Sequence, residues 1–477
     1  MTAPTDIASL LGELRASPHA AAFLTSRSGV ITRGDLADRA LAVAGELHSR
    51  GLQHGDTVGL AVRPGPETVA VLLASMRLGL RVVAADPRIA PQVFASSLRL
   101  AGVRLMITEP LVRLAAGPAA PIVGLFGIQL ARLDSVAPAT VMPRRLTVRP
   151  SPDHSDSDAD AVLVFTSGTT GRPRAVVHSP RTMSAGVASV TELTGVRRGD
   201  SVVASTVFAM LPALLAGAAV ATSIDRRTIH RVSPQFTYVT PPQARDLLEH
   251  GARFTGRVFT GSAPASTRLL TRLRDAGADE AWSVYALTEA FPVAAVESRD
   301  KADFDTAGDL VGDLMPGMSA RTDCAGEIVV AGSAMCTRYL GGDRLAEVAT
   351  GDRGVIDGTR VILHGRLKDM ILRRAVNIYP GLHEPSLHVA GVAQAVLVGV
   401  PDHDLDERVV LVVEPEPGVS ESELRRSLRG PIAALGDARP DDVLITTVPM
   451  SGRSRKPDRV ATAALAAGAS AMRMPRC

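Results

Sequence analysis

The residues best suited to chemistry lie in one stretch, Thr166–Ser179, which has the sequence TSGTTGRPRAVVHS. Two glycines and four hydroxyl residues fill its first six positions, between the apolar run 161–165 and the apolar pair Val176–Val177. This order predicts a strand, a tight polar loop and a second strand. Glycine permits backbone conformations that a Cβ forbids, and the amides of such a loop can point at an anion. Because Arg172 and Arg174 add positive charge, the stretch predicts a site that holds phosphate groups.

The stretch differs from the common nucleotide-binding loop, which has the pattern G-x-x-x-x-G-K-[ST] before a helix. Here the two glycines are three positions apart, no lysine follows the second, and the residues after the loop are typical of a strand. Taken alone, the stretch is also compatible with an ordinary Ser/Thr/Gly hairpin, because polar turns are common.

The composition is that of a globular chain, with 46% hydrophobic and 21% charged residues. Its 477 residues exceed one small core and predict several subdomains. A net charge of +3 predicts neither a nucleic acid nor a membrane partner. We expect no signal peptide, because Asp6 and Glu13 interrupt the N-terminus, and no membrane span. The three cysteines, Cys324, Cys336 and Cys477, lack metal-ligand spacing and suit a reducing compartment, so we expect a cytoplasmic protein. The sequence leaves the oligomeric state open.

Lysine is scarce in this chain. Only three of the 52 basic residues are lysine, at Lys301, Lys368 and Lys456, and the other 49 are arginine. Because lysine is generally replaced by arginine in this chain, an arginine at any one position needs no functional explanation. The same bias makes each remaining lysine a candidate functional residue.

The order of predicted elements indicates an α/β fold. The apolar spacing predicts helices over 32–50, 67–77, 90–101, 181–193, 242–250 and 264–276, and strands over 58–62, 81–85, 103–107, 201–205, 236–239, 258–260 and 281–284. Thr32 and Asp35 are a plausible capping pair for the first of these helices. Alternating strands and helices imply a parallel sheet covered by helices, interrupted by a polar linker over 151–160.

The sequence pattern changes after about Gly308, where short strand-like runs alternate with glycine turns. This pattern predicts a β-rich subdomain. Beyond Arg366 the chain is again compact α/β, with a helix expected over 421–428. We therefore expect a large N-terminal region, 1–366, of two α/β subdomains plus a β-rich one. A small mobile α+β C-terminal domain is expected over 367–477.

The motif TSGTTGRPRAV closely resembles the phosphate loop of the adenylate-forming superfamily, which contains acyl-CoA synthetases, aryl-CoA ligases and the adenylation domains of peptide synthetases. Five further motifs resemble those of this family at its approximate spacing: GSAPAS (261–266), VYALTEA (284–290), ATGDRG (349–354), GRLKDMILRRAVNIYP (365–380) and SGRSRKPDR (451–459). The resemblance covers nearly the whole chain.

The resemblance implies a role for each matching residue. Phosphate binding is implied for Thr166, Ser167, Gly168, Thr169, Thr170, Gly171 and Arg174, and nucleotide binding for Gly261, Ser262, Ala263, Pro264, Tyr285, Asp352 and Arg366. Among these, Asp352 would bind the ribose hydroxyls. Catalytic roles are implied for Lys456, Thr288 and Glu289, with Lys456 bridging the substrate carboxylate and the α-phosphate. Glu289 would also hold Mg²⁺, which prefers oxygen ligands. Lys368 would be the hinge of the C-terminal domain.

Several of these residues also fit ordinary structural roles when taken singly. Glu289 is compatible with a helix start, Asp352 with a turn, and Lys456 with a solvated basic tail. The scarcity of lysine favours the functional interpretation, since two of the three lysines fall on positions that the family marks.

The chain departs from the family pattern at four places. The phosphate loop has Arg174 and Ala175 where relatives have lysine and glycine, and Ala286 replaces a glycine of the acyl pocket. The segment that borders the pantetheine tunnel has Arg373, Arg374 and Ala375 where relatives have glycines, so this tunnel is narrowed or gains groups that grip CoA phosphates. The common aromatic-histidine pair is absent at 208–210. The acyl pocket is assigned to Phe208, Met210, Val284, Ala286 and Leu287.

The resemblance implies an ATP- and Mg²⁺-dependent acyl-CoA ligase that activates a carboxylic acid as its adenylate and passes it to coenzyme A. One alternative is an enzyme with a single half-reaction: thioesterification of a ready-made adenylate, or adenylation for an acyl carrier protein. Another is a non-catalytic AMP- or ATP-binding protein, and a third is a different ATP-binding fold. The acid itself is not determined, although low aromatic content suggests a cyclic, aryl or medium-length acid.

Overall fold

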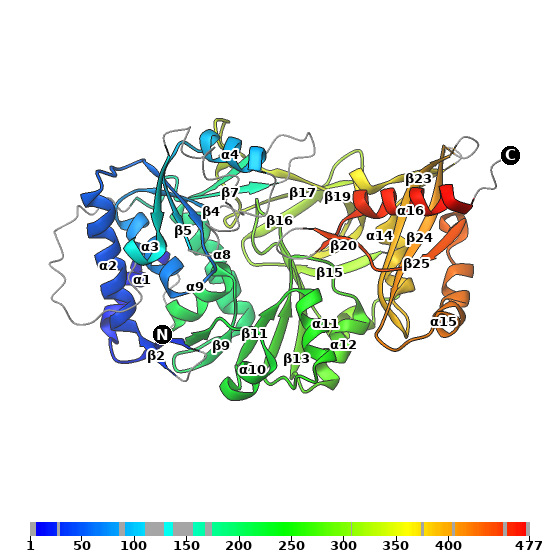
Figure 1. Cartoon of the computed structure of the whole chain (residues 1–477), viewed down its shortest axis with the longest axis horizontal. Helices are drawn as coiled ribbons and strands as arrows, with labels where there is room; N and C mark the ends of the chain where they lie inside the picture. Colours follow the sequence, from blue (N-terminus) through cyan, green and yellow to red (C-terminus); the bar gives the residue numbers. More distant parts are fainter. Residues whose placement is uncertain are drawn as a thin grey trace.

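A computed structural model describes residues 6–25, 29–84, 91–109, 128–136, 156–166, 174–306, 308–373, 376–402, 406–451 and 456–473. Within these ranges the chain forms two large sheets and a smaller C-terminal one. Figure 1 shows the C-terminal sheet at one end of the long axis, far from the first helices of the chain. The architecture is mixed α/β with a large N-terminal region and a smaller C-terminal domain, as the sequence predicted.

The largest sheet joins the second parallel unit to the β-rich segment. In spatial order its strands are β16 (Met318–Thr322), β17 (Glu327–Gly332), β19 (Val348–Asp357), β20 (Arg360–Arg366), β15 (Asp309–Leu314), β14 (Ala294–Glu297), β13 (Glu280–Tyr285), β12 (Arg257–Thr260), β11 (Phe236–Val239), β9 (Ser201–Val203), β10 (Ala219–Ala221), β1 (Ala21–Leu24) and β2 (Val30–Thr32). Pairing is parallel from β13 to β1 and antiparallel beyond both ends. The β-rich segment is therefore present, and its strands extend the parallel sheet.

The second sheet carries the predicted phosphate loop. Its order is β18 (Arg338–Tyr339), β8 (Arg174–His178), β7 (Val162–Thr166), β4 (Arg81–Ala84), β3 (Thr57–Ala61), β5 (Val103–Thr108) and β6 (Gln129–Arg132). Strands β7 and β8 pair antiparallel, with Thr166 opposite Arg174, so the two predicted strands are present, while the residues between them lie outside the described ranges. Strand β18 joins the edge of β8 from a distant part of the chain.

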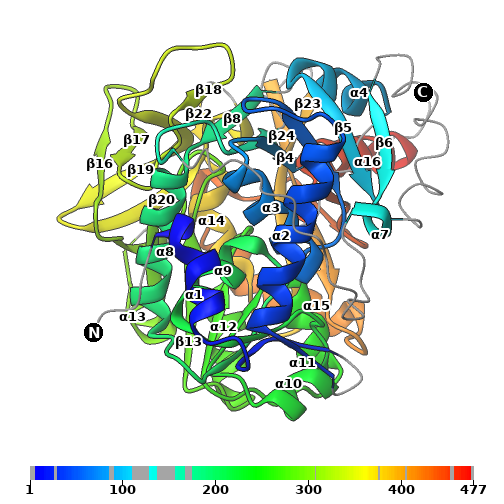
Figure 2. The same ribbon diagram turned by 90° about the vertical axis from the view of Figure 1, so that its left-hand side faces the viewer.

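Helices of the N-terminal region are α1 (Leu10–Ala16), α2 (Arg33–Ser49), α3 (Pro66–Arg77), α4 (Pro91–Leu100), α7 (Leu133–Val136), α8 (Pro180–Thr194), α9 (Val207–Ala216), α10 (Arg226–Val232), α11 (Pro241–Glu249), α12 (Thr267–Asp275) and α13 (Ser298–Ala302), with the 3₁₀ turn η1 (Ile7–Ser9). The largest buried cluster combines apolar residues of α2, α3, α8 and α9 with residues of both large sheets. These helices fill the space between the sheets, and Figure 2 shows α1, α2, α8 and α9 gathered at the N-terminal end.

Local chemistry explains most element boundaries. Thr32 and Asp35 form the predicted reciprocal capping box at the start of α2. Helix α12 begins at Thr267, later than expected, because the Ser266 side chain accepts from the Leu269 amide as its cap. Helix α9 was not predicted, because its uninterrupted apolar run, which contains Pro212, has no periodicity to mark a helix.

The C-terminal part has its own sheet and its own buried clusters. Its order is β22 (Val376–Ile378), β21 (Ile371–Arg373), β24 (Asp406–Pro415) and β23 (Val392–Asp402), with β25 (Asp442–Ile445) also paired to β24. Helices α14 (Pro380–Leu387), α15 (Glu421–Ala433) and α16 (Arg459–Arg473), with the 3₁₀ turns η2 (Leu367–Asp369) and η3 (Gly436–Ala438), accompany this sheet. A two-stranded ribbon, β26 (Met450–Ser451) with β27 (Lys456–Pro457), carries Lys456, the candidate catalytic lysine. Among the described helices, none has the length and apolarity needed to cross a membrane.

Candidate active site

The phosphate loop itself is largely outside the described residues. Ser167, Gly168, Thr169, Thr170 and Gly171 belong to this group, and only the backbone of Thr166 is described. The described part is the frame of the loop, the antiparallel β7–β8 pair that brings its two ends together. The predicted role of these residues in phosphate binding stays a prediction.

The exit of this loop lies against the predicted metal carboxylate. Strand β18 pairs with β8 so that Tyr339 stands opposite Val176. The Tyr339 hydroxyl donates to Glu289 Oε1 at 3.1 Å, and the Arg174 guanidinium carbon lies 5.6 Å from the centre of the Tyr339 ring. Burial, reinforced by the Glu289 charge, raises the pKa of Tyr339 to about 12. Tyr339 is therefore a neutral hydrogen-bond donor near pH 7.

A buried histidine fixes the backbone beside Glu289. His178, at the end of β8, is 3% exposed, and its Nε2 lies 2.8 Å from the Thr288 carbonyl oxygen. Because a carbonyl only accepts, Nε2 carries the hydrogen. Burial lowers the pKa of His178 below its ordinary value, against the opposing effect of that hydrogen bond and of Glu289. The Glu289 carbonyl accepts in turn from the Cys336 amide at 2.7 Å. Thr288 and Glu289 are thus held from β8 and from the segment that precedes β18.

The predicted ribose residues come together around one buried carboxylate. Asp352 is 3% exposed; its Oδ2 accepts from the Tyr285 hydroxyl at 2.6 Å and its Oδ1 lies 2.9 Å from Arg366 Nε. Asp352 and Arg366 face each other across the β19–β20 pair. Gly351 provides the left-handed φ of +73° that turns the chain into this position. Because each carboxylate oxygen has two acceptor sites, Asp352 retains capacity for ribose hydroxyls. The arrangement fits a nucleotide.

The two predicted lysines approach the same cluster. The pKa of Lys456 is lowered, first by loss of hydration around its ammonium and then by Arg366 and Lys368, while Asp352 acts in the opposite direction. Lys456, which is exposed, is therefore near enough to Lys368, Arg366 and Asp352 for their charges to interact. The third lysine, Lys301, is buried and ion-paired to Asp309, so its role is structural.

Ion pairs within the C-terminal domain fix the start of α16, close in sequence to Lys456. Arg459, three residues after Lys456, pairs with Asp369 at 3.1 Å and with Glu384 at 2.6 Å. Contacts between the two parts of the chain come from Arg268 and Arg272 of α12, which both pair with Glu416 after β24. The sequence did not mark any of these six residues for a positioning role, because each ion pair joins segments far apart in the chain.

The predicted adenine loop has the close packing that its small residues suggest. A Cβ on Gly261 would lie 2.6 Å from the Tyr238 hydroxyl oxygen, so any larger residue would have to displace the Tyr238 side chain. Ser262 adopts a left-handed φ of +69°, and its hydroxyl lies 3.4 Å from the Tyr238 hydroxyl. Ala263 and Pro264 complete the turn into α12.

The predicted acyl-pocket residues divide into two groups. Met210 and Val284 are buried within the main core. Phe208, Ala286 and Leu287 are half-buried, and the Phe208 ring lies 4.9 Å from that of Phe291. Their assignment to an acyl pocket stays a prediction, with the half-buried group the better placed.

The predicted CoA tunnel is described only at Arg373. Its guanidinium donates to the Asp437 and Arg439 carbonyls, at 3.2 and 2.9 Å, and pairs with Asp441. Arg373 is therefore engaged within the C-terminal sheet and its neighbouring loop. Arg374 and Ala375 lie outside the described residues.

The site residues fit a magnesium ion held partly by substrate. In the ranges that the structure describes, no group of three or more His, Cys, Asp or Glu side chains could hold a metal alone. Glu289 offers one carboxylate beside the phosphate-loop frame. Mg²⁺ typically binds through one or two carboxylates together with substrate phosphates, so Glu289 suits this ion.

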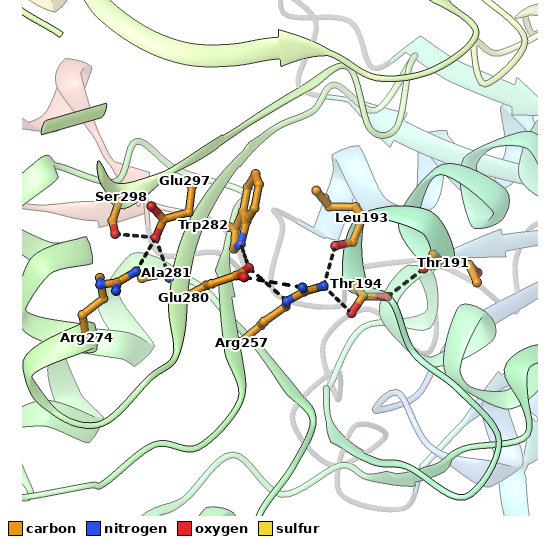
Figure 3. Close-up of polar contacts among 10 residues, drawn as sticks. All are labelled: Thr191, Leu193, Thr194, Arg257, Arg274, Glu280, Ala281, Trp282, Glu297 and Ser298. Carbon is orange, nitrogen blue, oxygen red and sulfur yellow. Dashed lines mark hydrogen bonds and ion pairs between the residues drawn. The ribbon is translucent and has the colours of Figure 1, made fainter. Parts of the chain in front are cut away.

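A cavity of about 470 Å³ lies elsewhere, beside β13, β14 and β15. Figure 3 shows that its polar residues bind one another: Arg257 pairs with Glu280 at 2.9 Å, and Glu280 accepts from Trp282 Nε1 at 2.8 Å. Arg257 also donates to the Thr194 carbonyl at the end of α8. The polar groups of this cavity therefore form hydrogen bonds and ion pairs with one another and link neighbouring elements of the fold. We assign the chemistry to the site that contains Asp352 and Glu289.

A family model described as "AMP-binding enzyme" matches residues 13–340, which is more than half of the chain. The chain therefore belongs to the AMP-binding enzyme family, within the adenylate-forming superfamily. The wider motifs quoted above had pointed to this family, and the match confirms it.

Individual relatives differ in what their names say they do. A PKS-NRPS hybrid synthetase from Aspergillus niger is 27% identical over 86% of this chain, and the chain spans 24% of that protein's length. The 2-succinylbenzoate–CoA ligase of Salmonella typhimurium is 25% identical over 80% of this chain and 81% of its own. In fold, the amide bond synthetase McbA from Marinactinospora thermotolerans matches with a TM-score of 0.80 and 23% identity, covering 96% of this chain and 99% of that one.

Proposed function

We propose that this protein is an AMP-forming acid–thiol ligase that activates a carboxylic acid as an acyl-adenylate and transfers the acyl group to coenzyme A. The observation that carries the proposal is the cluster of Asp352, Tyr285 and Arg366 with Lys456 beside it. A CoA ligase that matches most of the chain supports the thiol acceptor. The proposal assumes the division at 366/367, with Lys368 as its hinge.

Each residue has a definite task in the first step. Asp352 accepts from the ribose hydroxyls and Arg366 contacts the nucleotide, which orients ATP. The acid's carboxylate oxygen attacks the α-phosphorus, the bond to the bridging oxygen breaks, and pyrophosphate leaves. Lys456 donates to the negative charge that gathers between carboxylate and α-phosphate, where a fixed donor stabilises the transition state more than the ground state. When bound, Mg²⁺ supplies charge neutralisation at the leaving phosphates, and Glu289 and the phosphates would hold it.

In the second step the CoA thiolate attacks the acyl carbonyl and AMP leaves. Arg373 is engaged in its own domain, so it is not free to grip CoA in this conformation. This observation favours as a second candidate an enzyme that adenylates an acid for a different acceptor, such as an acyl carrier protein.

The proposal is tested by measuring the half-reactions separately on a panel of aryl, cyclic and medium-chain acids. Acid-dependent ATP–pyrophosphate exchange together with acyl-CoA formation, identified by mass spectrometry, is the expected result. Exchange without acyl-CoA, but with acylation of a carrier protein or an amine, would support the second candidate. AMP binding with neither exchange nor thioester formation would leave a non-catalytic nucleotide-binding protein.

A further inference from the structure

Tyr339 is a side chain that sequence reasoning did not select, yet it contacts two residues assigned to the phosphate end of the site. Its hydroxyl donates to Glu289 Oε1 at 3.1 Å, and its ring lies 5.6 Å from the Arg174 guanidinium carbon. The pairing of β18 with β8 fixes its backbone opposite Val176. The position is therefore set by sheet register and is independent of Glu289 itself.

The backbone around Glu289 has separate supports. His178 binds the Thr288 carbonyl, and the Cys336 amide donates to the Glu289 carbonyl. These contacts fix where the residue lies but leave the torsion angles of its side chain free. The Tyr339 hydroxyl donates to one carboxylate oxygen, and among the described residues the other oxygen is left available to a cation.

We propose that Tyr339 is a positioning residue for Mg²⁺-bound ATP, which aims the Glu289 carboxylate through its hydroxyl and the Arg174 guanidinium through its ring. The proposal rests on the proposed function, which assigns Glu289 to the metal and Arg174 to phosphate. A phenol suits this place because it orients a carboxylate without bringing a competing positive charge to a cation site. Its ring face attracts a planar guanidinium, which explains why arginine is well accommodated at position 174.

Two substitutions separate these contacts. Tyr339→Phe removes the hydroxyl and keeps the ring, whereas Tyr339→Leu removes both. Binding of AMP without Mg²⁺, and of ATP during a Mg²⁺ titration, is measured by calorimetry, which needs no turnover. For Tyr339→Phe we expect the Mg²⁺ concentration at half-maximal ATP binding to rise about tenfold, since loss of a residue that orients a metal ligand typically weakens metal binding by ~10–100-fold. AMP affinity should stay within about twofold, because AMP lacks the phosphates that the metal holds.

Tyr339→Leu should in addition weaken ATP binding at saturating Mg²⁺ by about threefold, as Arg174 loses its ring partner. The matched control is Tyr379→Phe, because the ring of Tyr379 is likewise covered by an arginine, Arg353, and its hydroxyl is likewise hydrogen-bonded, here accepting from Arg353 at 2.7 Å. This control should leave the Mg²⁺ titration unchanged. All three variants are also compared with the wild type by thermal unfolding.

The outcomes distinguish this proposal from the proposed function. An unchanged Mg²⁺ titration in Tyr339→Phe, with normal folding, would overturn the role of Tyr339 alone. An equal loss of AMP and ATP affinity would also overturn it, since that indicates general damage to the site. A wild-type protein whose ATP binding ignores Mg²⁺ and which gives no pyrophosphate exchange would overturn the proposed function.

Discussion

The proposed ribose end and the proposed phosphate end of the site are assembled over different distances along the chain. Asp352 and Arg366 face each other within one pair of consecutive strands, β19 and β20. At the phosphate end, His178 reaches Thr288 across 110 positions and Tyr339 reaches Glu289 across 50. The charged pair of the proposed ribose end depends on a local hairpin, to which Tyr285 adds one contact across 67 positions, whereas the proposed phosphate end depends on the pairing of β18 with β8. The ribose end should therefore be lost through single residues, whereas the phosphate end shares its task among several.

The largest effect is expected at Lys456, which lies near the ribose cluster but is proposed to act in the transition state. Lys456→Ala should lower acid-dependent ATP–pyrophosphate exchange by about 10²–10³-fold, the usual cost of removing a donor to developing charge. AMP affinity measured by calorimetry should hardly change. Lys456→Arg keeps the charge and should still lose about tenfold or more, because a planar guanidinium does not replace a compact ammonium. Full activity in both variants would remove Lys456 from the chemistry.

The next largest effect is expected at Asp352. Asp352→Asn removes the charged partner of Arg366 and one acceptor for ribose, so the affinities for AMP and ATP should fall together by about 10–100-fold, as for the loss of charged hydrogen bonds. Asp357→Asn, an exposed carboxylate on the same strand, is the control and should bind normally. If ATP alone were weakened, the assignment of Asp352 to ribose would be wrong.

A smaller effect is expected at Arg174, where the phosphate end shares its charge among several groups. Arg174→Ala should weaken ATP binding by about fivefold and leave AMP binding unchanged, while Arg174→Lys should lose no more than about twofold, because the charge remains and only the ring contact is weakened. The measurement is the ratio of ATP to AMP affinity. A large drop in Arg174→Lys would show that guanidinium geometry is essential.

The smallest effect is a pH dependence of stability at His178. Its folded pKa is lowered by burial, so below the ordinary value near 6.5 the unfolded chain binds a proton that the native state resists. Stability should therefore fall as pH drops below about 6.5. Urea unfolding at pH 5.5 and 7.5 measures this, and His178→Gln should show a smaller difference between the two. An unchanged difference would place the titrating group elsewhere.

Much of the fold was predictable because it follows from local patterns. Apolar spacing located the strand–helix alternation, and Thr32 with Asp35 marked the start of α2. Helix α9 was not predicted, because an unbroken apolar run does not distinguish a buried helix from a buried strand. The β-rich segment was predicted, but its extension of the parallel sheet through β14 and β15 depends on hydrogen bonds that no local pattern encodes.

For the site, the sequence by itself determined the residue types that suit nucleotide chemistry, since Asp352, Arg366 and Lys456 stand in recognisable motifs and lysine is rare elsewhere. Only the tertiary structure decided that Lys301 is a buried structural ion pair, that Arg373 is engaged in its own domain, and that His178 and Tyr339 support Thr288 and Glu289. The physical reason is that a motif fixes chemistry over a few residues. The partners of a side chain are instead set by strand pairing and packing between segments that are distant in the chain.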